Sequence, residues 1–586
     1  MAHRASAFIA LVLTIVFTGA CGGPAATLPT AAPAASTATA ALLPTAAPQT
    51  PAASDQIAIA LYDLGPSTIE QTQEQSERRN MPYRIQGLIA APAAPGPHPL
   101  IVVTHGAHPG CPVSGDPPID TWPCPPDQEQ RNDLGWRYLL EALAREGYVA
   151  VSLNMNAVNT VAWGGLGSAY ERYASVLDTH LSRLIAANRG GEQGFGLDLT
   201  GQIDFSRTAL VGHGQGGGHA ILYAAKRNEP AYADAGGPLV AALLVAPAPQ
   251  HNVPDLPSSP NTTATPDLPI GIVMGLCDGD VPDLAGFAYY EQARAQPQRS
   301  QTVQVVVPHG ANHTFFNAVL GAGSLEPEGA PGCGRAAGRL SPAQQQAFLA
   351  AYAQDFFATV FSKAAPSEAW QPGSAPPQQL YGVPVLTALL TPAAARQALV
   401  QTADGTPPAD TGRVTLSVSD ALDSSVCRYQ SEHCDPARYG IPAAQNLNQL
   451  IRLSWKQRGE TLRLTLPPDQ RDLSPFAALQ LRAALDGFEQ ANSNGQALTF
   501  RLRDTGGKEA SVTLPAETHA LQPPAALVRD AGTPETLLQG VTPLAAVRVP
   551  LAGFAGVDLT QIESIAVVFD QSNQGAVLVT DLELLR

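Results

Sequence analysis

The stretch Thr208-Ala-Leu-Val-Gly-His-Gly-Gln-Gly-Gly-Gly218 joins an apolar run to a cluster of glycines. The apolar part predicts a buried strand, and the segment from Gly217 to Lys226 predicts a helix that follows almost at once. A chain that passes from strand to helix within so few residues needs a sharp turn with close packing across it. Gly212 and Gly216 flank this turn, where a side chain would obstruct the packing. The stretch therefore predicts a tight strand–turn–helix unit.

The same alternation of strand and helix extends from about Asp55 to Ala365. Several apolar runs are continuous, as expected for strands covered by helices on both faces. Strands are expected at 84–90, 100–104, 149–153, 208–211, 240–246, 270–274 and 303–307. Helices are expected at 134–146, 170–187, 217–226, 284–295 and 342–361. This rhythm predicts an α/β domain with a mostly parallel sheet.

Beyond about Ser367 the sequence changes to short runs of alternating polarity, separated by turn residues. They lie at 414–418, 450–455, 461–466, 478–483, 498–503, 510–514, 546–549, 564–569 and 576–582. This pattern predicts an all-β sandwich. The last runs, from Val547 to Leu582, resemble the closing strands of galactose-binding and carbohydrate-binding jelly-roll domains. We therefore expect an α/β domain over 56–365, a linker over 366–380 and a jelly-roll-like β-sandwich over 381–586.

Near the N-terminus, an apolar run from Ala7 to Phe17 has the length and layout of a secretory signal, too short to span a bilayer as a stable anchor. It ends in Thr18-Gly19-Ala20-Cys21, which resembles the lipobox of bacterial lipoproteins, with threonine where that motif usually has an aliphatic residue. The resemblance implies a signal peptide over 1–21, acylation of Cys21 and an extracytoplasmic protein anchored in a bacterial cell envelope. The alternative is an ordinary cleaved signal peptide.

Composition limits the organisation and the partners further. Residues 22–55 are almost all Ala, Pro and Thr, which predicts a disordered tether. The chain of 586 residues is too long for one hydrophobic core, in agreement with several domains. A formal net charge of −16 argues against nucleic acid or an anionic membrane surface as a partner bound through charge. Contact with a membrane is therefore expected only through the lipid anchor.

The cysteines agree with an exported protein. Seven cysteines include Cys21, and the other six form an even set. The expected pairs are Cys111 with Cys124, Cys427 with Cys434 and, by elimination, Cys277 with Cys333. An oxidising compartment favours disulfides over the alternative of buried free thiols.

The glycine-rich turn resembles the nucleophile elbow of α/β-hydrolases, G-x-S-x-G, whose serine lies at the top of the turn. In this sequence Gly214 stands at the position of that serine, between His213 and Gln215. A generic glycine-rich turn is the alternative for this segment taken alone. The resemblance implies an α/β-hydrolase fold and a site of the carboxylic-ester-hydrolase type.

A segment upstream of the turn agrees with this resemblance. Ile101-Val-Val-Thr-His-Gly-Ala107 is a buried strand that ends in His-Gly, and it resembles the loop that carries the oxyanion hole. The resemblance implies that the backbone N–H groups of Ala107 and Gln215 face the developing oxyanion. Such donors act because charge accumulates on the carbonyl oxygen in the transition state.

Two segments downstream of the turn resemble the acid and histidine loops of the family, in the family's order. The acid loop, Gly275 to Val281, offers Asp278 as the first choice and Asp280 as the second. The histidine loop ends in His313, the expected base, and His309 is the less favoured candidate. Taken singly, the aspartates could be turn residues or part of a calcium loop, and His313 could cap a loop.

A glycine at the nucleophile position removes the standard reaction, because Gly214 has no oxygen to attack a carbonyl and no acyl-enzyme can form. Loss of a triad member typically lowers activity by a factor on the order of a million. Three hypotheses follow. The chain is a pseudo-hydrolase that binds a ligand, or His313 and Asp278 activate a water for slow hydrolysis, or Gly214 is an error or an engineered replacement in an active esterase-like enzyme.

The alternative function is an envelope protein that binds a ligand in the hydrolase pocket or a glycan on the sandwich. Trp455, Tyr429 and Tyr439 are the candidate aromatic contacts for a glycan, with a place in the core as the alternative for Trp455. A purely structural sandwich is an equal alternative. The sequence has no zinc-ligand spacing and no nucleotide-binding motif, so neither a metal nor a cofactor is expected. The expected partners are a small-molecule ester or related ligand and a polysaccharide.

Overall fold

The computed structural model describes the chain from Gln56 to Arg586 with internal gaps. The described residues are 56–70, 80–115, 119–160, 169–228, 237–248, 265–320, 338–362, 364–400, 414–428, 430–446, 450–515, 517–523, 528–529, 538–539 and 541–586. The predicted signal peptide with Cys21 and the predicted tether lie outside these residues, as do Cys333 and Tyr429.

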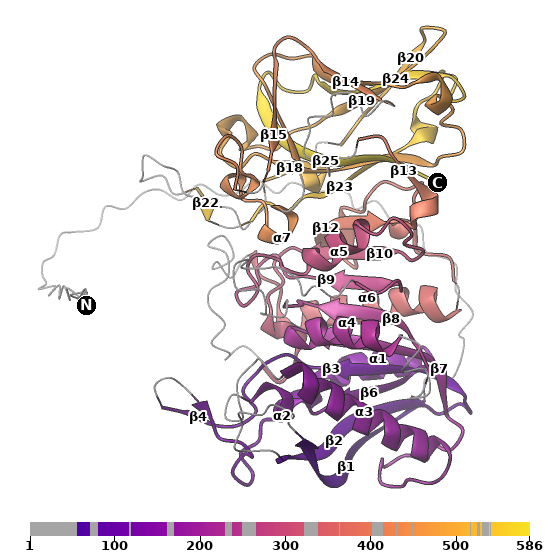
Figure 1. Cartoon of the computed structure of the whole chain (residues 1–586), viewed down its shortest axis with the longest axis vertical. Helices are drawn as coiled ribbons and strands as arrows, with labels where there is room; N and C mark the ends of the chain where they lie inside the picture. The colour runs from indigo at the N-terminus through magenta and orange to yellow at the C-terminus, as the bar shows by residue number, and fades with distance from the viewer. Residues whose placement is uncertain are drawn as a thin grey trace, which may run out of the picture. The chain divides into compact units, whose positions relative to one another are not determined.

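A sheet of ten strands forms the centre of the first domain, in the order β1-β2-β6-β3-β7-β8-β9-β10-β12-β11 (Figure 1). Its strands are β1 Ile57–Glu70, β2 Asn80–Pro92, β3 His98–Thr104, β6 Val149–Leu153, β7 Ile203–His213, β8 Leu239–Val245, β9 Ile270–Val273, β10 Val303–Pro308, β11 Gln379–Leu380 and β12 Val383–Leu390. The six strands from β6 to β10 in this order are parallel. The edge strands β1, β2, β12 and β11 pair antiparallel. The predicted α/β class with a mostly parallel sheet is therefore observed.

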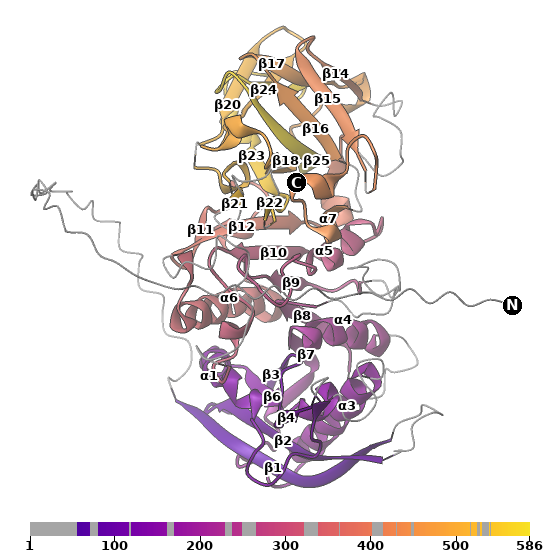
Figure 2. The same ribbon diagram turned by 90° about the vertical axis from the view of Figure 1, so that its left-hand side faces the viewer.

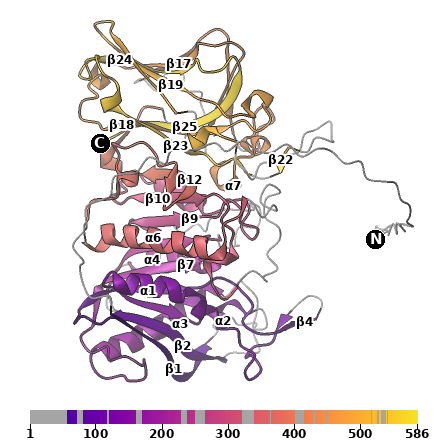
Figure 3. The ribbon, with the colours of Figure 1, turned by 180° about the vertical axis from the view of Figure 1, so that it is seen from behind.

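Helices cover both faces of this sheet. They are α1 Arg137–Arg145, α2 Asn156–Asn159, α3 Ala169–Asn188, α4 Gln215–Arg227, α5 Phe287–Arg294 and α6 Pro342–Ser362. Helices α1 and α6 lie on one face and α3 and α4 on the other (Figures 2 and 3). Strands β6, β9 and β10 are buried at every position, which explains their continuous apolar sequence. Among the described helices, none combines the length and the apolar character needed to cross a membrane.

The sheet extends past the predicted linker. Strand β12 pairs with β10, with Val303 opposite Leu390, although the sequence prediction assigned residues from 381 onward to the sandwich. The change in composition that suggested the boundary lies in the Pro-rich segment before β12. The apolar run of β12 is buried from Val385 to Leu390 because it covers the edge of the parallel sheet. Strand β1, paired with β2 along its length, was also not predicted.

The C-terminal part is a sandwich of two antiparallel sheets. One sheet has the order β15 Leu422–Cys427, β16 Leu450–Trp455, β25 Gly575–Leu585, β18 Ala478–Leu485 and β23 Ala545–Pro550, and β13 Arg396–Ala398 also pairs with β25. The other has the order β14 Thr415–Val418, β17 Glu460–Thr465, β24 Ile562–Phe569, β19 Thr499–Asp504 and β20 Glu509–Thr513. The remaining short elements are β4 Val113–Ser114, β5 Ile119–Asp120, α7 Ala443–Asn446, β21 Val528–Arg529 and β22 Leu538–Gln539. The nine strands that the sequence predicted here are all present, and β13, β15, β21 and β22 are additions.

Trp455 belongs to the core of the sandwich. Its side chain is 2% exposed and stacks on Phe569 with ring centroids 4.4 Å apart. A buried ring offers no surface to a sugar, so Trp455 is wrong as a candidate glycan contact. Tyr439 is half-buried beneath the guanidinium of Arg452, which lies 5.4 Å from the ring centroid.

Two of the predicted disulfides are confirmed. They join Cys111 to Cys124 and Cys427 to Cys434. Cys277 is also disulfide-bonded, and its predicted partner, Cys333, lies outside the described residues.

Buried ion pairs join the first domain to the sandwich. Arg482 on β18 binds Glu291 on α5, with Nη2 3.0 Å from Oε2, and it also pairs with Asp581 on β25. Arg294 on α5 approaches the same strand, with Nε 2.9 Å from Oδ1 of Asp581. The side chain of Arg482 is 1% exposed. Removal of one partner from such a group leaves a charge buried without compensation.

We therefore expect Glu291→Ala to lower the free energy of unfolding by about 3–5 kcal/mol, as measured by chemical denaturation. Glu509→Ala is the matched control, because Glu509 is largely exposed where it pairs with Arg503 and such pairs contribute at most about 1 kcal/mol. Equal losses in the two variants would contradict the role assigned to the buried pairs.

Two buried histidines make the first domain sensitive to acid. Burial lowers the pKa of His219 to about 3 and that of His180 to about 3. His180 Nδ1 lies 2.9 Å from the hydroxyl of Tyr62, and Nδ1 of His219 has no hydrogen bond within the described part of the chain. Below a pH of about 6.5 the unfolded chain takes up these protons while the folded chain does not, so stability falls with the pH.

Between pH 7 and pH 5 each such histidine should lower the free energy of unfolding by about 2 kcal/mol. In His219→Gln the free energy of unfolding should fall less between pH 7 and pH 5, by the amount that His219 contributes, because glutamine does not titrate. Denaturation at both pH values measures the difference, and the exposed His433→Gln serves as the control. An unchanged pH profile in His219→Gln would show that this histidine is not kept neutral by the fold.

Candidate functional site

Gly214 lies at the junction of β7 and α4, at the top of the predicted turn. Its φ of 53° and ψ of −125° lie in a region that side chains rarely adopt. Its N–H donates to the carbonyl of Val245 at 2.9 Å. Its carbonyl accepts hydrogen bonds from the N–H groups of Gly217 and Ala248. The turn is therefore fixed by backbone contacts on both sides of Gly214.

The two flanking glycines permit the close packing that the sequence predicted. A Cβ added to Gly212 would lie 2.4 Å from the carbonyl oxygen of Gly216. A Cβ added to Gly216 would lie 2.7 Å from the carbonyl oxygen of His105. Both obstructing atoms belong to the backbone, which cannot move aside as a side chain can. The strand–turn–helix unit thus depends on glycine at these two positions.

His313 and Asp278 meet directly opposite this turn. Nδ1 of His313, in the loop after β10, lies 3.0 Å from Oδ2 of Asp278, in the loop after β9. A Cβ added to Gly214 would lie 3.1 Å from Nε2 of His313. The structure therefore brings the three predicted positions into the order nucleophile position, base, acid.

The carboxylate that binds Nδ1 of His313 belongs to Asp278, the first choice for the acid, and not to the second choice, Asp280. Asp278 is 2% exposed, and its Oδ1 accepts hydrogen bonds from the N–H groups of Val281 and Asp280 at 2.6 and 2.9 Å. The side chain of Asp280 is 64% exposed, with Oδ2 3.4 Å from Nε2 of His313. Because Asp278 accepts on Nδ1, the lone pair of a neutral His313 lies on Nε2 and faces Gly214.

Contacts that the sequence did not indicate hold the histidine loop in place. The N–H of Asn312 donates to Oε1 of Gln345 at 3.0 Å, and Nε2 of Gln345 donates to the carbonyl of Asn312 at 2.7 Å. Gln345 lies on α6 and is fully buried. The N–H of Cys277 donates to the carbonyl of Ala311 at 2.8 Å, which ties the acid loop to the histidine loop. The sequence could have offered only one signal, a glutamine on the apolar face of a helix.

One predicted oxyanion donor, Gln215, lies at the turn, and the loop that carries the other, Ala107, passes beside the turn at Gly106. Gln215 is the first residue of α4, so its N–H has no acceptor within the helix. The Cα of Gly106, adjacent to Ala107, lies 3.5 Å from the Cβ position of Gly214. Asn159 donates from Nδ2 to the carbonyl of Gly106 at 2.9 Å, which fixes this loop. The other candidate base, His309, stacks on His519 instead, with ring centroids 5.1 Å apart.

Two further histidines, neither of them predicted from the sequence as a site residue, lie beside His313. Nε2 of His108 lies 3.3 Å from Nδ1 of His213. Nε2 of His213 lies 3.1 Å from the carbonyl oxygen of His313. Burial, and next the neighbouring His313, hold the pKa of both His108 and His213 well below its usual range. His213 is the last residue of β7, and the other two rings come from the loops after β3 and β10, so no local spacing could reveal them.

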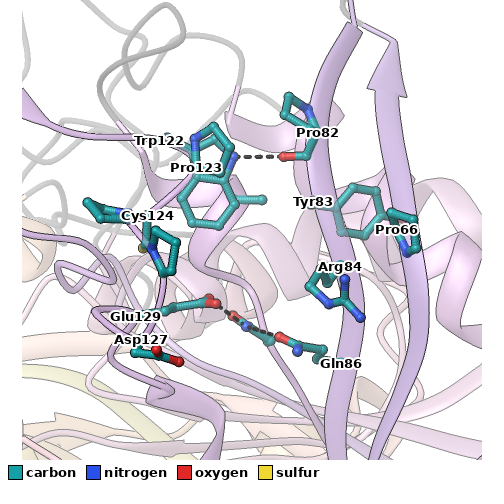
Figure 4. A pocket seen from close by; sticks show the side chains of 14 residues that line it. Pro66, Pro82, Tyr83, Arg84, Gln86, Trp122, Pro123, Cys124, Asp127 and Glu129 are labelled. Atoms are coloured by element: carbon teal, nitrogen blue, oxygen red, sulfur yellow. Dashed lines mark hydrogen bonds between the residues drawn. The ribbon is translucent and has the colours of Figure 1, made fainter.

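A cavity of about 330 Å³ lies elsewhere, between β2 and the loop closed by the Cys111–Cys124 disulfide. Trp122 donates from Nε1 to the carbonyl of Pro82 at 2.8 Å at its rim, and Arg84 and Glu129 line it as well (Figure 4). Neither Gly214, Asp278 nor His313 is among its lining residues.

No protein-family model matches the chain, and no curated protein matches it by sequence. Among solved structures, a dienelactone hydrolase-like promiscuous phosphotriesterase from metagenomic libraries shows 15% identity and a TM-score of 0.29, over 52% of this chain and 98% of its own. A ferulic acid esterase from Streptomyces cinnamoneus shows 15% identity and a TM-score of 0.34, over 54% and 93%. A family 11 carbohydrate-binding module from Clostridium thermocellum, solved with a mixed-linked tetrasaccharide, shows 10% identity and a TM-score of 0.20, over 33% and 95%. These neighbours are similar in fold alone.

We expect Gly212→Ala to destabilise the first domain by about 1–3 kcal/mol or more, because the new methyl group would overlap backbone atoms. The control is Gly373→Ala, where the nearest atom to an added Cβ is a methyl carbon of Ala477 at 3.5 Å. Chemical denaturation measures both variants. A Gly212→Ala protein as stable as the control would contradict the close packing described at the turn.

Proposed function

We propose that this chain is a hydrolase-fold protein of the carboxylic-ester-hydrolase type in which serine chemistry has been lost at Gly214. The single observation that supports it is the geometry at the turn. The Cβ position of Gly214 lies 3.1 Å from Nε2 of His313, and Nδ1 of the same ring binds Asp278. The side chain of a serine at position 214 would lie beside Nε2 of His313 as its base, with Asp278 as the acid on the other ring nitrogen.

The remaining residues support a weak hydrolysis through water. Asp278 fixes the proton of His313 on Nδ1, so Nε2 can accept a proton from a water in the space that a serine side chain would fill. The oxygen of that water would attack the ester carbonyl, and the N–H groups of Ala107 and Gln215 would stabilise the oxyanion. This route lacks the covalent intermediate of the serine mechanism, so we expect it to be slow.

Gly214→Ser should create an active esterase. Loss of the serine of a triad typically lowers kcat by a factor on the order of a million, so its introduction should raise the rate with short-chain p-nitrophenyl esters by several orders of magnitude. The φ of 53° makes the position costly for a side chain, so we also expect a loss of about 1–3 kcal/mol in stability. Steady-state kinetics and denaturation measure the two effects.

The control places His313→Ala or Asp278→Asn in the Gly214→Ser background, where each should return the rate to that of the unchanged protein. High activity of the unchanged protein that a serine-directed phosphonate abolishes would overturn the proposal, because it would reveal a serine elsewhere as the nucleophile. An inactive but folded Gly214→Ser protein would also count against it.

Two further parts of the proposal come from the sequence. We propose that the protein is extracytoplasmic and anchored through an acylated Cys21, on the strength of the signal-like run before it. Binding of a ligand in the hydrolase pocket, or of a glycan on the sandwich, remains the alternative function. Of its three aromatic candidates Trp455 is buried and Tyr429 lies outside the described residues, so only Tyr439 is left on the described surface.

A further inference from the structure

We propose that His108, His213 and His313 bind one divalent transition-metal ion of the zinc type, with an open coordination position beside Gly214. Among the described residues these three form a group whose ligand nitrogens all lie within 4.8 Å of one another. Imidazole nitrogen is the commonest protein ligand of such ions, and three histidines with one open position form a known kind of catalytic zinc site.

The spacing of the nitrogens fits such an ion after a small adjustment. Two nitrogens at about 2.0–2.1 Å from one tetrahedral zinc lie roughly 3.3–3.4 Å apart, and Nε2 of His108 already lies 3.3 Å from Nδ1 of His213. Two ligands of one ion are at most about 4.2 Å apart, so a nitrogen pair at the upper limit of 4.8 Å would close by about 0.6 Å. His108 is only half-buried and lies in a loop, where such a movement costs little.

The hydrogen bonds of His213 and His313 direct their lone pairs inward. A carbonyl only accepts, so Nε2 of His213 carries the proton that it donates to the carbonyl of His313 at 3.1 Å, and its Nδ1 carries a lone pair. Nδ1 of His313 donates to Asp278 at 3.0 Å, which leaves the lone pair on Nε2. Metal-bound histidines typically have their second nitrogen fixed in this way by a carbonyl or a carboxylate.

Two glycines leave space at the centre of the group. A Cβ added to Gly106 would lie 3.2 Å from Nε2 of His108 and 3.3 Å from Nδ1 of His213. A Cβ added to Gly214 would lie 3.1 Å from Nε2 of His313. The position at which a serine side chain would stand is therefore available to a metal-bound water.

A bound ion would supply the nucleophile that Gly214 lacks, an inference that rests on the proposed function. A metal ion lowers the pKa of its water, so that hydroxide is present near neutral pH. The hydroxide oxygen would form a bond to the acyl carbon and the ester C–O bond would break, with its electron pair leaving on the alcohol oxygen. That oxygen takes a proton from water, and the next metal-bound water releases one to solvent, so ester and water give acid and alcohol.

The test is a titration of the full chain with Co²⁺ and Zn²⁺, followed by visible absorption and equilibrium dialysis. We expect one ion per chain, a tetrahedral Co²⁺ spectrum and a raised Tm. Asp278→Asn removes a residue that orients a ligand and should weaken metal binding by about 10–100-fold. His108→Gln and His213→Gln each remove a ligand itself and should weaken metal binding by more than that. The control is His309→Gln, whose ring stacks on His519 away from the site.

The proposal is overturned if the unchanged chain takes up no ion, or if His108→Gln and His213→Gln bind as tightly as the control while their circular dichroism shows a folded protein. Esterase assays separate this outcome from failure of the proposed function. An active Gly214→Ser protein that also tolerates His108→Gln supports the hydrolase framework without the metal. Metal uptake with no hydrolysis in any variant supports the metal site alone.

Discussion

The hydrogen bond between Nδ1 of His313 and Oδ2 of Asp278, 3.0 Å long and almost wholly buried, determines what this site can do. It fixes the proton of the ring on Nδ1 and thereby places the lone pair on Nε2, toward Gly214. The loops that carry the two residues are tied together by the bond from Cys277 to Ala311. We infer that a pair held so firmly serves as a base, or as a metal ligand, without first changing its own geometry.

The absence of a side chain at Gly214 then decides which chemistry remains. Hydrogen bonds to Val245, Gly217 and Ala248 hold the backbone of Gly214 in its positive-φ conformation. This conformation would strain a residue with a side chain, but glycine adopts it readily. His313, Asp278 and the turn therefore keep the arrangement in which Nε2 of His313 faces Gly214. We infer that a water, free or bound to an ion on the three histidines, takes the place of a serine oxygen.

Much of this site could be predicted from the sequence, because each part lies at the end of a strand with its own local signal. Gly212, Gly216, Asp278 and His313 stand in such segments, and the structure brings them together. His108 and Gln345 could not be predicted, since their roles arise from contacts between distant loops. Similar limits apply to the fold. The apolar sequence of β12 does not indicate which of the two neighbouring sheets the strand joins. The sequence around Trp455 does not indicate whether the ring faces solvent or packs on Phe569.

The most direct measurement of the central claim is the reaction of the Gly214→Ser protein with a fluorophosphonate, followed by intact-protein and peptide mass spectrometry. The geometry predicts a single adduct at position 214 that forms faster than in the same variant with His313→Ala, and no adduct in the unchanged protein. An adduct on the unchanged protein, or no reaction of a folded Gly214→Ser chain, would contradict the placement of Gly214 at the nucleophile position.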